Sequence, residues 1–170
     1  GLRIAIGHAG GSITAGLAIR GNDLVLKVLV LTELIASVLT SVTDVFGEVN
    51  ISGYRVGTQA GFCANLNSQT TPTNFILIYI DSTSSAAVLK IDKCVAGVYT
   101  NLASSIITYS SGASLRFSTR TVNADLKVRA YYNNVFIGSE LTISDASIVS
   151  NNQHGLFSTS QNTLFDNFVI

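Results

Sequence analysis

The sequence has few charged residues, little cysteine and almost no proline. Asp, Glu, Lys and Arg make up 12% of the 170 residues, about half of the roughly 25% that is usual in soluble proteins. Ten basic and ten acidic residues cancel to a formal net charge of +0. Nucleic-acid binding depends on a basic surface that neutralises phosphates, so this balance argues against a nucleic-acid partner. A surface with so little charge must be covered by Ser, Thr, Asn and Gly, which is typical of an extracellular or virion-type β domain.

Cysteine is too scarce for a structural zinc site. Cys63 and Cys94 are the only two, and they form no Cys-x-x-Cys pair. Both lie in strand-like runs, which leaves two interpretations open: buried free thiols, or a disulfide between neighbouring strands. The chain contains no Met and begins at Gly1, from which we expect it to be a processed product or part of a longer polypeptide.

The residues that hydrolytic enzymes need are also scarce. The only Glu residues are Glu33, Glu48 and Glu140, whereas glycoside hydrolysis uses two carboxyls that face one groove. Glu140 and Asp145 are five residues apart, which in a strand puts them on opposite faces. The sequence has no Gly-x-Ser-x-Gly motif and two histidines, His8 and His154, of which we interpret His154 as an exposed loop residue. We predict a protein that is not an enzyme.

The apolar stretch from Leu24 to Val42 could be a membrane span, a helix or strands. Lys27 and Glu33 lie inside it, and a charge at the centre of a span costs about 2.5–3.5 kcal/mol on an insertion scale. Val, Ile and Thr are frequent in this stretch, which favours strands. We therefore predict two strands that separate near Thr32-Glu33, and no membrane span.

The rest of the chain alternates short apolar runs with turn residues. Residues 75–80 form the most apolar run, which is typical of a central strand buried on both faces. Residues 125–132 alternate polar and apolar side chains, and Asn133-Asn134 then predicts a tight hairpin. Many short strands without helical periods indicate one domain, residues 1–170, built as a two-sheet antiparallel sandwich or jelly roll. The predicted core residues are Phe62, Phe75, Leu77, Tyr79, Leu89, Ile91, Leu115, Phe117, Leu126, Val128, Phe136, Leu156, Phe165 and Phe168, with a bulge or bend near Asp166-Asn167.

Three segments of the last third carry a family resemblance. They are the hairpin Leu126–Ile137, the Gly155-Leu-Phe-Ser run and the closing Phe165-Asp-Asn-Phe-Val-Ile segment. Together they resemble the end of concanavalin A-like lectin/glucanase domains, also called laminin-G-like jelly rolls, over residues 61–170. The family usually has Gly at the hairpin turn, where Asn133 and Asn134 stand here. The resemblance implies an all-β concanavalin A-like fold of the kind found in bacterial surface and phage virion proteins.

Two kinds of ligand site are predicted. Sugar rings stack on exposed aromatic residues, and guanidinium or amino groups bind their hydroxyls. The candidates on the polar faces of the strands are Tyr131, Arg129, Lys127, Tyr109, Arg116 and Arg120; ordinary cross-strand pairing is the alternative for these residues. The resemblance also implies structural calcium, with Asp166 as a ligand. Calcium takes six to eight oxygens, so Asp166 alone does not define a site, and local hydrogen bonding is its alternative role.

Two functions follow from these observations. The first is a non-catalytic carbohydrate-binding or adhesion module, extracellular or on a virion surface, with a glycan as partner. The second is a structural decoration or assembly domain, a homo-oligomer or lattice component that packs against capsid, tail or fibre subunits.

Overall fold

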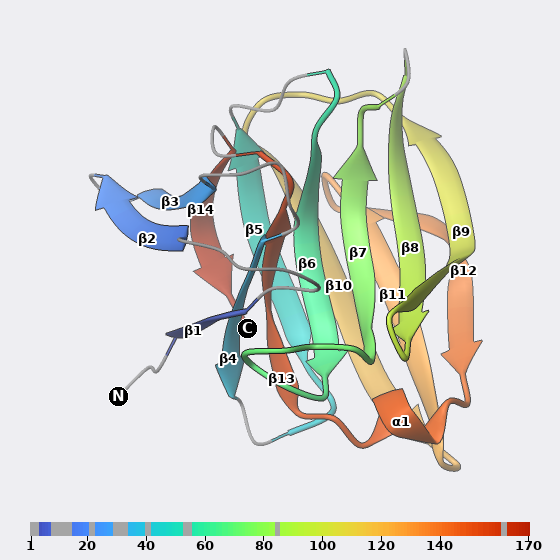
Figure 1. Cartoon of the computed structure of the whole chain (residues 1–170). Coiled ribbons are helices and arrows are strands. Elements are labelled where there is room, and N and C mark those ends of the chain that lie inside the picture. Colours follow the sequence, from blue (N-terminus) through green and yellow to red (C-terminus); the bar gives the residue numbers. More distant parts are fainter. Residues whose placement is uncertain are drawn as a thin grey trace.

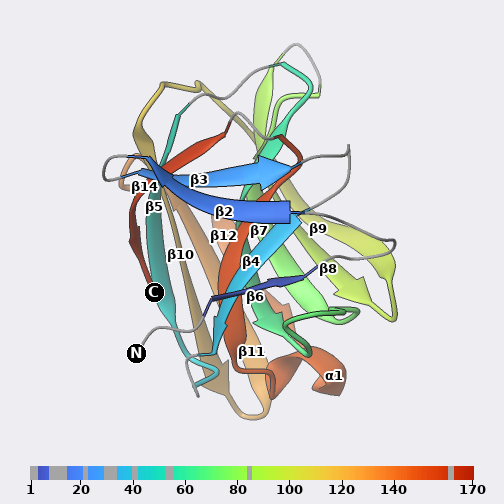
Figure 2. The same cartoon turned by 60° about the vertical axis from the view of Figure 1, so that its left-hand side comes forward.

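The computed structural model shows two antiparallel sheets packed face to face (Figure 1). It describes residues 4–7, 15–20, 23–28, 34–39, 42–52, 56–83, 86–160 and 163–170, with side chains from residue 42 onward. We call the two layers sheet A and sheet B; Figure 2 shows them after a 60° turn. A single short helix, α1 (Ala146–Val149), lies in the described part of the chain.

Seven strands of each sheet lie within the described residues. Sheet A has the order β1 (Ile4–Gly7), β4 (Leu34–Leu39), β13 (Gln153–Ser158), β6 (Gln59–Leu66), β7 (Phe75–Asp81), β8 (Ala87–Val95) and β9 (Val98–Ile107). Sheet B has the order β12 (Val135–Ile143), β11 (Asp125–Tyr132), β10 (Ala113–Val122), β5 (Phe46–Ser52), β14 (Leu164–Val169), β3 (Asp23–Val28) and β2 (Ala15–Arg20). This all-β, two-sheet jelly-roll architecture confirms the predicted fold class.

The apolar stretch between residues 24 and 42 contributes strands, as predicted. β3 pairs with β14 and β2 in sheet B, whereas β4 pairs with β13 and β1 in sheet A. Residues 29–33, where we expected the break, lie outside the described residues. Within the described residues, no helix has the length and apolarity that a membrane crossing requires.

Two-residue hairpins set the register between neighbouring strands in both sheets. Asn133 and Asn134 have φ angles of 49° and 66°, the left-handed values that a type I′ turn requires at both positions. The turn joins β11 to β12 and confirms the predicted hairpin. Asn123-Ala124 and Ala96-Gly97 have positive φ angles in the same way, and they join β10 to β11 and β8 to β9. Asn and Gly suit these turns because they tolerate left-handed backbone.

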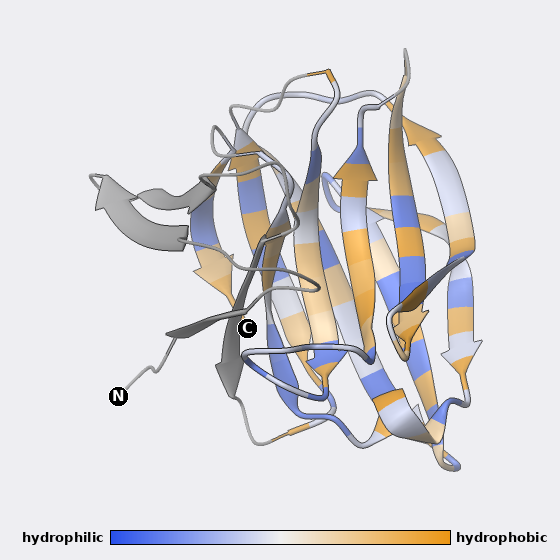
Figure 3. Cartoon of the chain, viewed as in Figure 1, coloured by the Kyte–Doolittle hydropathy of each residue, from blue (hydrophilic) through white to orange (hydrophobic). Residues whose placement is uncertain are grey.

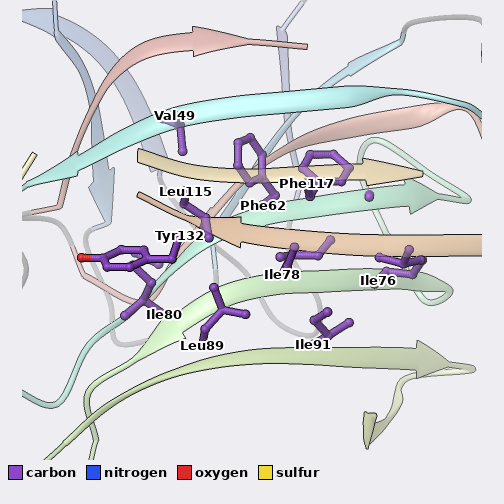
Figure 4. Packing of buried hydrophobic residues seen from close by; sticks show 14 of the residues in the cluster. Val49, Phe62, Ile76, Ile78, Ile80, Leu89, Ile91, Leu115, Phe117 and Tyr132 are labelled. Atoms are coloured by element: carbon purple, nitrogen blue, oxygen red, sulfur yellow. The ribbon is translucent and has the colours of Figure 1, made fainter. Parts of the chain in front are cut away.

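The main core lies between the sheets. Alternate side chains of sheets A and B point inward, and Phe62 of β6 meets Phe117 of β10 with ring centroids 4.7 Å apart. Figure 4 shows aliphatic residues from β5, β7, β8 and β10 around this aromatic pair. The alternation appears as bands of opposite hydropathy along β8 and β10 in Figure 3. Of the predicted core, the residues that occupy this cluster are Phe62, Leu89, Ile91, Leu115, Phe117, Leu126, Val128, Leu156 and Phe165.

A second cluster of buried residues lies on the outer face of sheet A. Phe75, Leu77 and Tyr79 of β7 belong to it, because their neighbours along the strand already point into the main core. All seven residues of β7 are buried, as predicted for a central strand. Phe75, Leu77 and Tyr79 are therefore buried, but in this outer cluster and not between the sheets.

The closing strand β14 contains the predicted bulge. Its pairing with β5 shifts register between Asp166 and Val169, and Asn167 has a φ angle of 54°. Phe165 is fully buried, while Phe168 is partly buried and packs 6.3 Å from Phe62 between ring centroids. The bulge lets both rings approach the core, although they are three residues apart.

Candidate functional site

Five of the six predicted sugar-binding residues lie on the outer face of sheet B. Leu115, Phe117 and every second residue with them on β10 point into the core. Arg116 and Arg120 lie at the positions between them and therefore point outward. On β11, the same alternation turns Lys127, Arg129 and Tyr131 outward. The register opposes Arg116 to Tyr131 and Arg120 to Lys127. The strand period therefore brings these five residues together.

One row of outward side chains crosses five strands of sheet B. Strand pairing places Val169 (β14) beside Glu48 (β5), Glu48 beside Arg116 (β10), Arg116 beside Tyr131 (β11) and Tyr131 beside Phe136 (β12). We call these five residues the aromatic–arginine row. Four strand spacings of about 4.8 Å give it a length of about 19 Å. The row is therefore long enough to contact an extended ligand.

Aromatic rings dominate one end of the row. The centroids of Tyr131 and Phe136 are 5.4 Å apart. The guanidinium of Arg116 lies 4.9 Å from the ring centroid of Phe46 and 5.9 Å from that of Tyr131. Phe46 is 41% exposed and Phe136 is 44% exposed. These rings offer accessible apolar faces beside a cation.

The prediction that Phe136 belongs to the core is wrong. The two-residue Asn133-Asn134 turn opposes Tyr131 directly to Phe136, so both must share the outer face. This consequence of the turn could have been read from the sequence. Phe46 was also missed; it stands three residues before inward-facing Val49, on the outer side of β5.

Polar partners hold Arg116 in place within the row. Its Nη1 donates to Asn134 Oδ1 at 2.6 Å, and its Nε lies 3.6 Å from Glu48 Oε2. Ser114 Oγ donates to Glu48 Oε1 at 2.8 Å, which fixes that carboxylate. Because both neighbours and both rings restrain the guanidinium, Arg116 is positioned before any ligand arrives.

A group of cations lies further along β10 and β11. We call Arg120, Lys127 and Arg129 the cation cluster. Arg129 Nε donates to Glu140 Oε2 at 2.7 Å, and Arg120 Nη2 donates to the same oxygen at 3.2 Å. Hydrogen bonds with Tyr131 and then with Glu140 raise the pKa of Arg129 above its usual value. Desolvation acts to raise the pKa of Glu140, but the two arginines outweigh it and hold that pKa below its usual value.

Tyr109 does not join this face. It lies between β9 and β10, is partly buried against the main core, and its hydroxyl donates to the Ile51 carbonyl at 3.2 Å. A residue in a connection does not follow the alternation of the neighbouring strand, which is why the strand period misplaced it.

Asp166, the predicted calcium ligand, lies opposite Asn50. Its Oδ1 accepts from the Asn167 backbone N–H at 2.7 Å, and Asn167 Nδ2 lies 3.4 Å from its Oδ2 and 3.2 Å from Asn50 Oδ1. Among the described side chains, no group of three or more His, Cys, Asp or Glu residues is placed to hold a metal ion. This oxygen set falls short of the six to eight that calcium takes. Calcium at Asp166 stays a prediction.

His154 is fully buried, so its prediction as an exposed loop residue is wrong. It lies on β13, where its Nδ1 accepts from the Asn65 N–H at 3.2 Å. Its Nε2 lies 3.0 Å from the Val42 carbonyl, to which it donates in this tautomer. Burial lowers the pKa of the imidazole. His154 is thus a structural residue that joins β13 to β6 and to the segment before β5; His8 lies outside the described residues.

Both cysteines are buried free thiols, which was one of the two open interpretations. Cys63 is on β6 and Cys94 is on β8, with β7 between them. Two strand spacings of about 4.8 Å exceed the reach of a disulfide. Burial raises the pKa of the Cys63 thiol, which makes it a weak nucleophile.

Comparisons with known proteins bear on the fold. No protein-family model and no curated protein matches the sequence. A carbohydrate-binding module, CBM66, from Bacillus subtilis is similar in structure, with a TM-score of 0.64 and 15% identity over 95% of this chain and 94% of the module. The metal-free carbohydrate recognition domain of Emp46p has a TM-score of 0.59 and 11% identity over 91% of this chain and 83% of that domain.

A xylan β-1,4-xylosidase from Bacillus halodurans is also similar, with a TM-score of 0.60 and 12% identity. The match covers 88% of this chain but 32% of the xylosidase, so the chain spans about a third of that enzyme. At such low identity the likeness shows the fold alone: a concanavalin A-like jelly-roll domain, as the resemblance of the last third implied.

Proposed function

We propose that this concanavalin A-like jelly-roll domain is a non-catalytic carbohydrate-binding module that uses the outer face of sheet B. The observation that carries the proposal is the aromatic–arginine row with its Tyr131–Phe136 pair, in which Tyr131 is partly buried and Phe136 is 44% exposed. Two of the similar structures are named as a carbohydrate-binding module and a carbohydrate recognition domain, which supports the same class of function.

The chemistry of the row suits sugars. A pyranose ring has apolar C–H faces that stack on aromatic rings, and its hydroxyls accept hydrogen bonds from guanidinium groups. Tyr131 and Phe136 supply the rings, and Arg116 and Arg129 supply the donors beside them. Glu48 and Glu140, the glutamates on this face, each contact an arginine, which suits binding better than acid–base catalysis. With a glycan as partner, we infer an extracellular or virion-surface location for the domain.

The test is a glycan array screened with the isolated chain, with calcium and with chelator. We expect a specific hit that Tyr131→Ala weakens by about tenfold or more, as expected for one lost aromatic contact. Tyr99→Ala is the matched control, because Tyr99 is 40% exposed and lies on β9 of the other sheet. A hit that Tyr131→Ala leaves intact, or silence from a folded chain, contradicts the proposal. Loss of the hit in chelator supports calcium at Asp166.

A second function, a structural assembly domain, is favoured by strand β9. This strand is at the edge of sheet A, has ten residues and carries no charge. Val98 and Ile106 on it are 67% and 80% exposed, and natural edge strands usually carry charges that prevent pairing with other chains. Sedimentation at increasing concentration tests this: a homo-oligomer that Ile106→Lys dissociates supports the assembly function, and a monomer at all concentrations counts against self-assembly.

A further inference from the structure

The cation cluster places like charges at opposed and diagonal positions of two paired strands. Arg120 and Lys127 are register partners on β10 and β11. Arg129 follows Lys127 by two residues on the same face, and is therefore the diagonal neighbour of Arg120. Like charges directly opposite on adjacent strands destabilise a sheet. The arrangement therefore has a cost in the free protein that an anionic ligand would remove.

The nearby carboxylates do not neutralise the cluster. Glu140 is shared by Arg120 and Arg129. Asp125, the other described carboxylate that forms an ion pair with this cluster, lies 4.0 Å from Lys127, at the outer limit of an ion pair. Three cations against two carboxylates leave one surplus positive charge, in a chain whose formal net charge is +0. The side chains of Arg120 and Arg129 are 57% and 45% exposed, so a ligand can reach them.

We propose that the ligand is an acidic polysaccharide, with a carboxylate or sulfate bound by the cation cluster and a sugar ring stacked on Tyr131 and Phe136. The inference rests on the proposed carbohydrate-binding function. Guanidinium groups bind carboxylates and sulfates through paired hydrogen bonds. The Arg120–Lys127 pair supplies a second cation opposite the first. Glu140 pairs with Arg120 and Arg129 but not with Lys127. An acidic group of the ligand would therefore bind beside Arg120 and Lys127.

The distance along β11 sets the minimum size of the ligand. Tyr131 follows Arg129 by two residues and Lys127 by four, which corresponds to about 7 Å and about 13 Å along the strand. An acidic group at the cation cluster and a ring on the aromatic pair therefore belong to different sugar units. A single surplus charge suits spaced acidic groups better than the continuous phosphates of a nucleic acid, which need several cations in a line.

The test measures binding of polygalacturonate, alginate and chondroitin sulfate, each beside its methyl-esterified or desulfated derivative. We expect an acidic form to bind about fivefold or more tightly than its neutral derivative, and to weaken as salt rises. Arg120→Gln should weaken the acidic form severalfold. Lys93→Gln is the matched control, because Lys93 lies on β8 of sheet A and pairs with Asp145 before helix α1. Glu140→Gln removes the carboxylate that pairs with Arg120 and Arg129, raises the net charge of this face by one, and should tighten binding of the acidic form.

The outcomes separate this inference from the function on which it rests. Equal binding of acidic and neutral forms, with loss in Tyr131→Ala, overturns the acidic ligand and keeps the carbohydrate-binding function. Equal binding of polyglutamate or single-stranded DNA overturns the polysaccharide, since the surface would then bind any polyanion. No binding of any polysaccharide by the folded chain overturns both. Tightening in Glu140→Gln together with weakening in Arg120→Gln supports the acidic ligand, because a loss of folding weakens both variants.

Discussion

At the scale of single residues, His154 couples the fold to pH. Its Nδ1 accepts a hydrogen bond from the Asn65 backbone N–H, so a proton cannot be added there without breaking that bond. In the folded state, burial lowers the pKa of the His154 imidazole below its ordinary value of 6.5, although the hydrogen bond to the Val42 carbonyl acts in the opposite direction. Below pH 6.5 the unfolded chain therefore binds more protons at this position than the folded chain does. Acid thus favours unfolding through this residue.

We predict that the free energy of unfolding falls as the pH decreases from 6.5 towards the folded-state pKa of His154. One proton contributes a slope of up to about 1.4 kcal/mol per pH unit, and the slope fades as the pH rises above 6.5 and the unfolded imidazole loses its proton. Urea unfolding at intervals between pH 5 and pH 8 measures this slope. His154→Gln should flatten the slope in that window while lowering stability at pH 7. An unchanged slope in the variant would show that His154 is not the source of the pH dependence.

At the scale of elements, the Asn133-Asn134 hairpin has two roles. Its left-handed backbone opposes Tyr131 to Phe136, which builds the aromatic end of the row. The side chain of Asn134 also accepts a hydrogen bond from Arg116 at 2.6 Å. The turn therefore supports the site both through register and through a direct contact.

Substitutions of Asn134 separate these roles. Asn134→Ala should destabilise the domain by about 1–2 kcal/mol, because Ala resists left-handed backbone. Asn134→Gly should leave stability nearly unchanged, because Gly adopts this conformation freely. Both variants lose the bond to Arg116, so glycan affinity should drop a fewfold in each. Thermal unfolding and a binding titration measure the two effects; equal stability of the Ala and Gly variants would show that the turn conformation has no energetic role.

At the scale of the whole molecule, one sandwich carries two classes of aromatic residue. Phe62 has no exposed surface and packs on Phe117 between the sheets. Phe136 is 44% exposed and packs on Tyr131 outside them. The same residue type therefore has two roles: Phe62 contributes to stability, and Phe136 contributes to the proposed binding site.

The two phenylalanines make a matched pair. We predict that Phe62→Ala lowers the free energy of unfolding by about 3–5 kcal/mol, because it leaves a cavity between the sheets. Phe136→Ala should cost about 1 kcal/mol or less, the size of a cross-strand pair, and should weaken glycan binding. Denaturant unfolding and a glycan titration measure both. A large loss of stability in Phe136→Ala would mean that the outer aromatic pair is structural.

Most features that depend on residues close in the sequence were predicted correctly, whereas features that depend on distant segments were not. Period-two alternation predicted the outward residues of β10 and β11 and the inward core around Phe117, because the rule is local. Asn133-Asn134 predicted its hairpin for the same reason. Tyr109 and His154 were misplaced, because the burial of residues outside a regular alternation depends on distant segments such as the Ile51 and Val42 carbonyls. The overall composition does not predict the cation cluster, because a net charge of zero gives no information on how the charges are distributed over the surface.

The sequence by itself determined the all-β class, the turns and the strand alternation, because backbone preference and side-chain period act over a few residues. Only the tertiary structure decided the order of strands in each sheet. That order placed Val169, Glu48, Arg116, Tyr131 and Phe136 in one row. Glu48 and Val169 are neighbours in this row, although they are 121 positions apart in the sequence (169 − 48). The same order placed β7 between Cys63 and Cys94 and kept both thiols free. Pairing between distant strands depends on the packing of the entire core, and no local pattern encodes it.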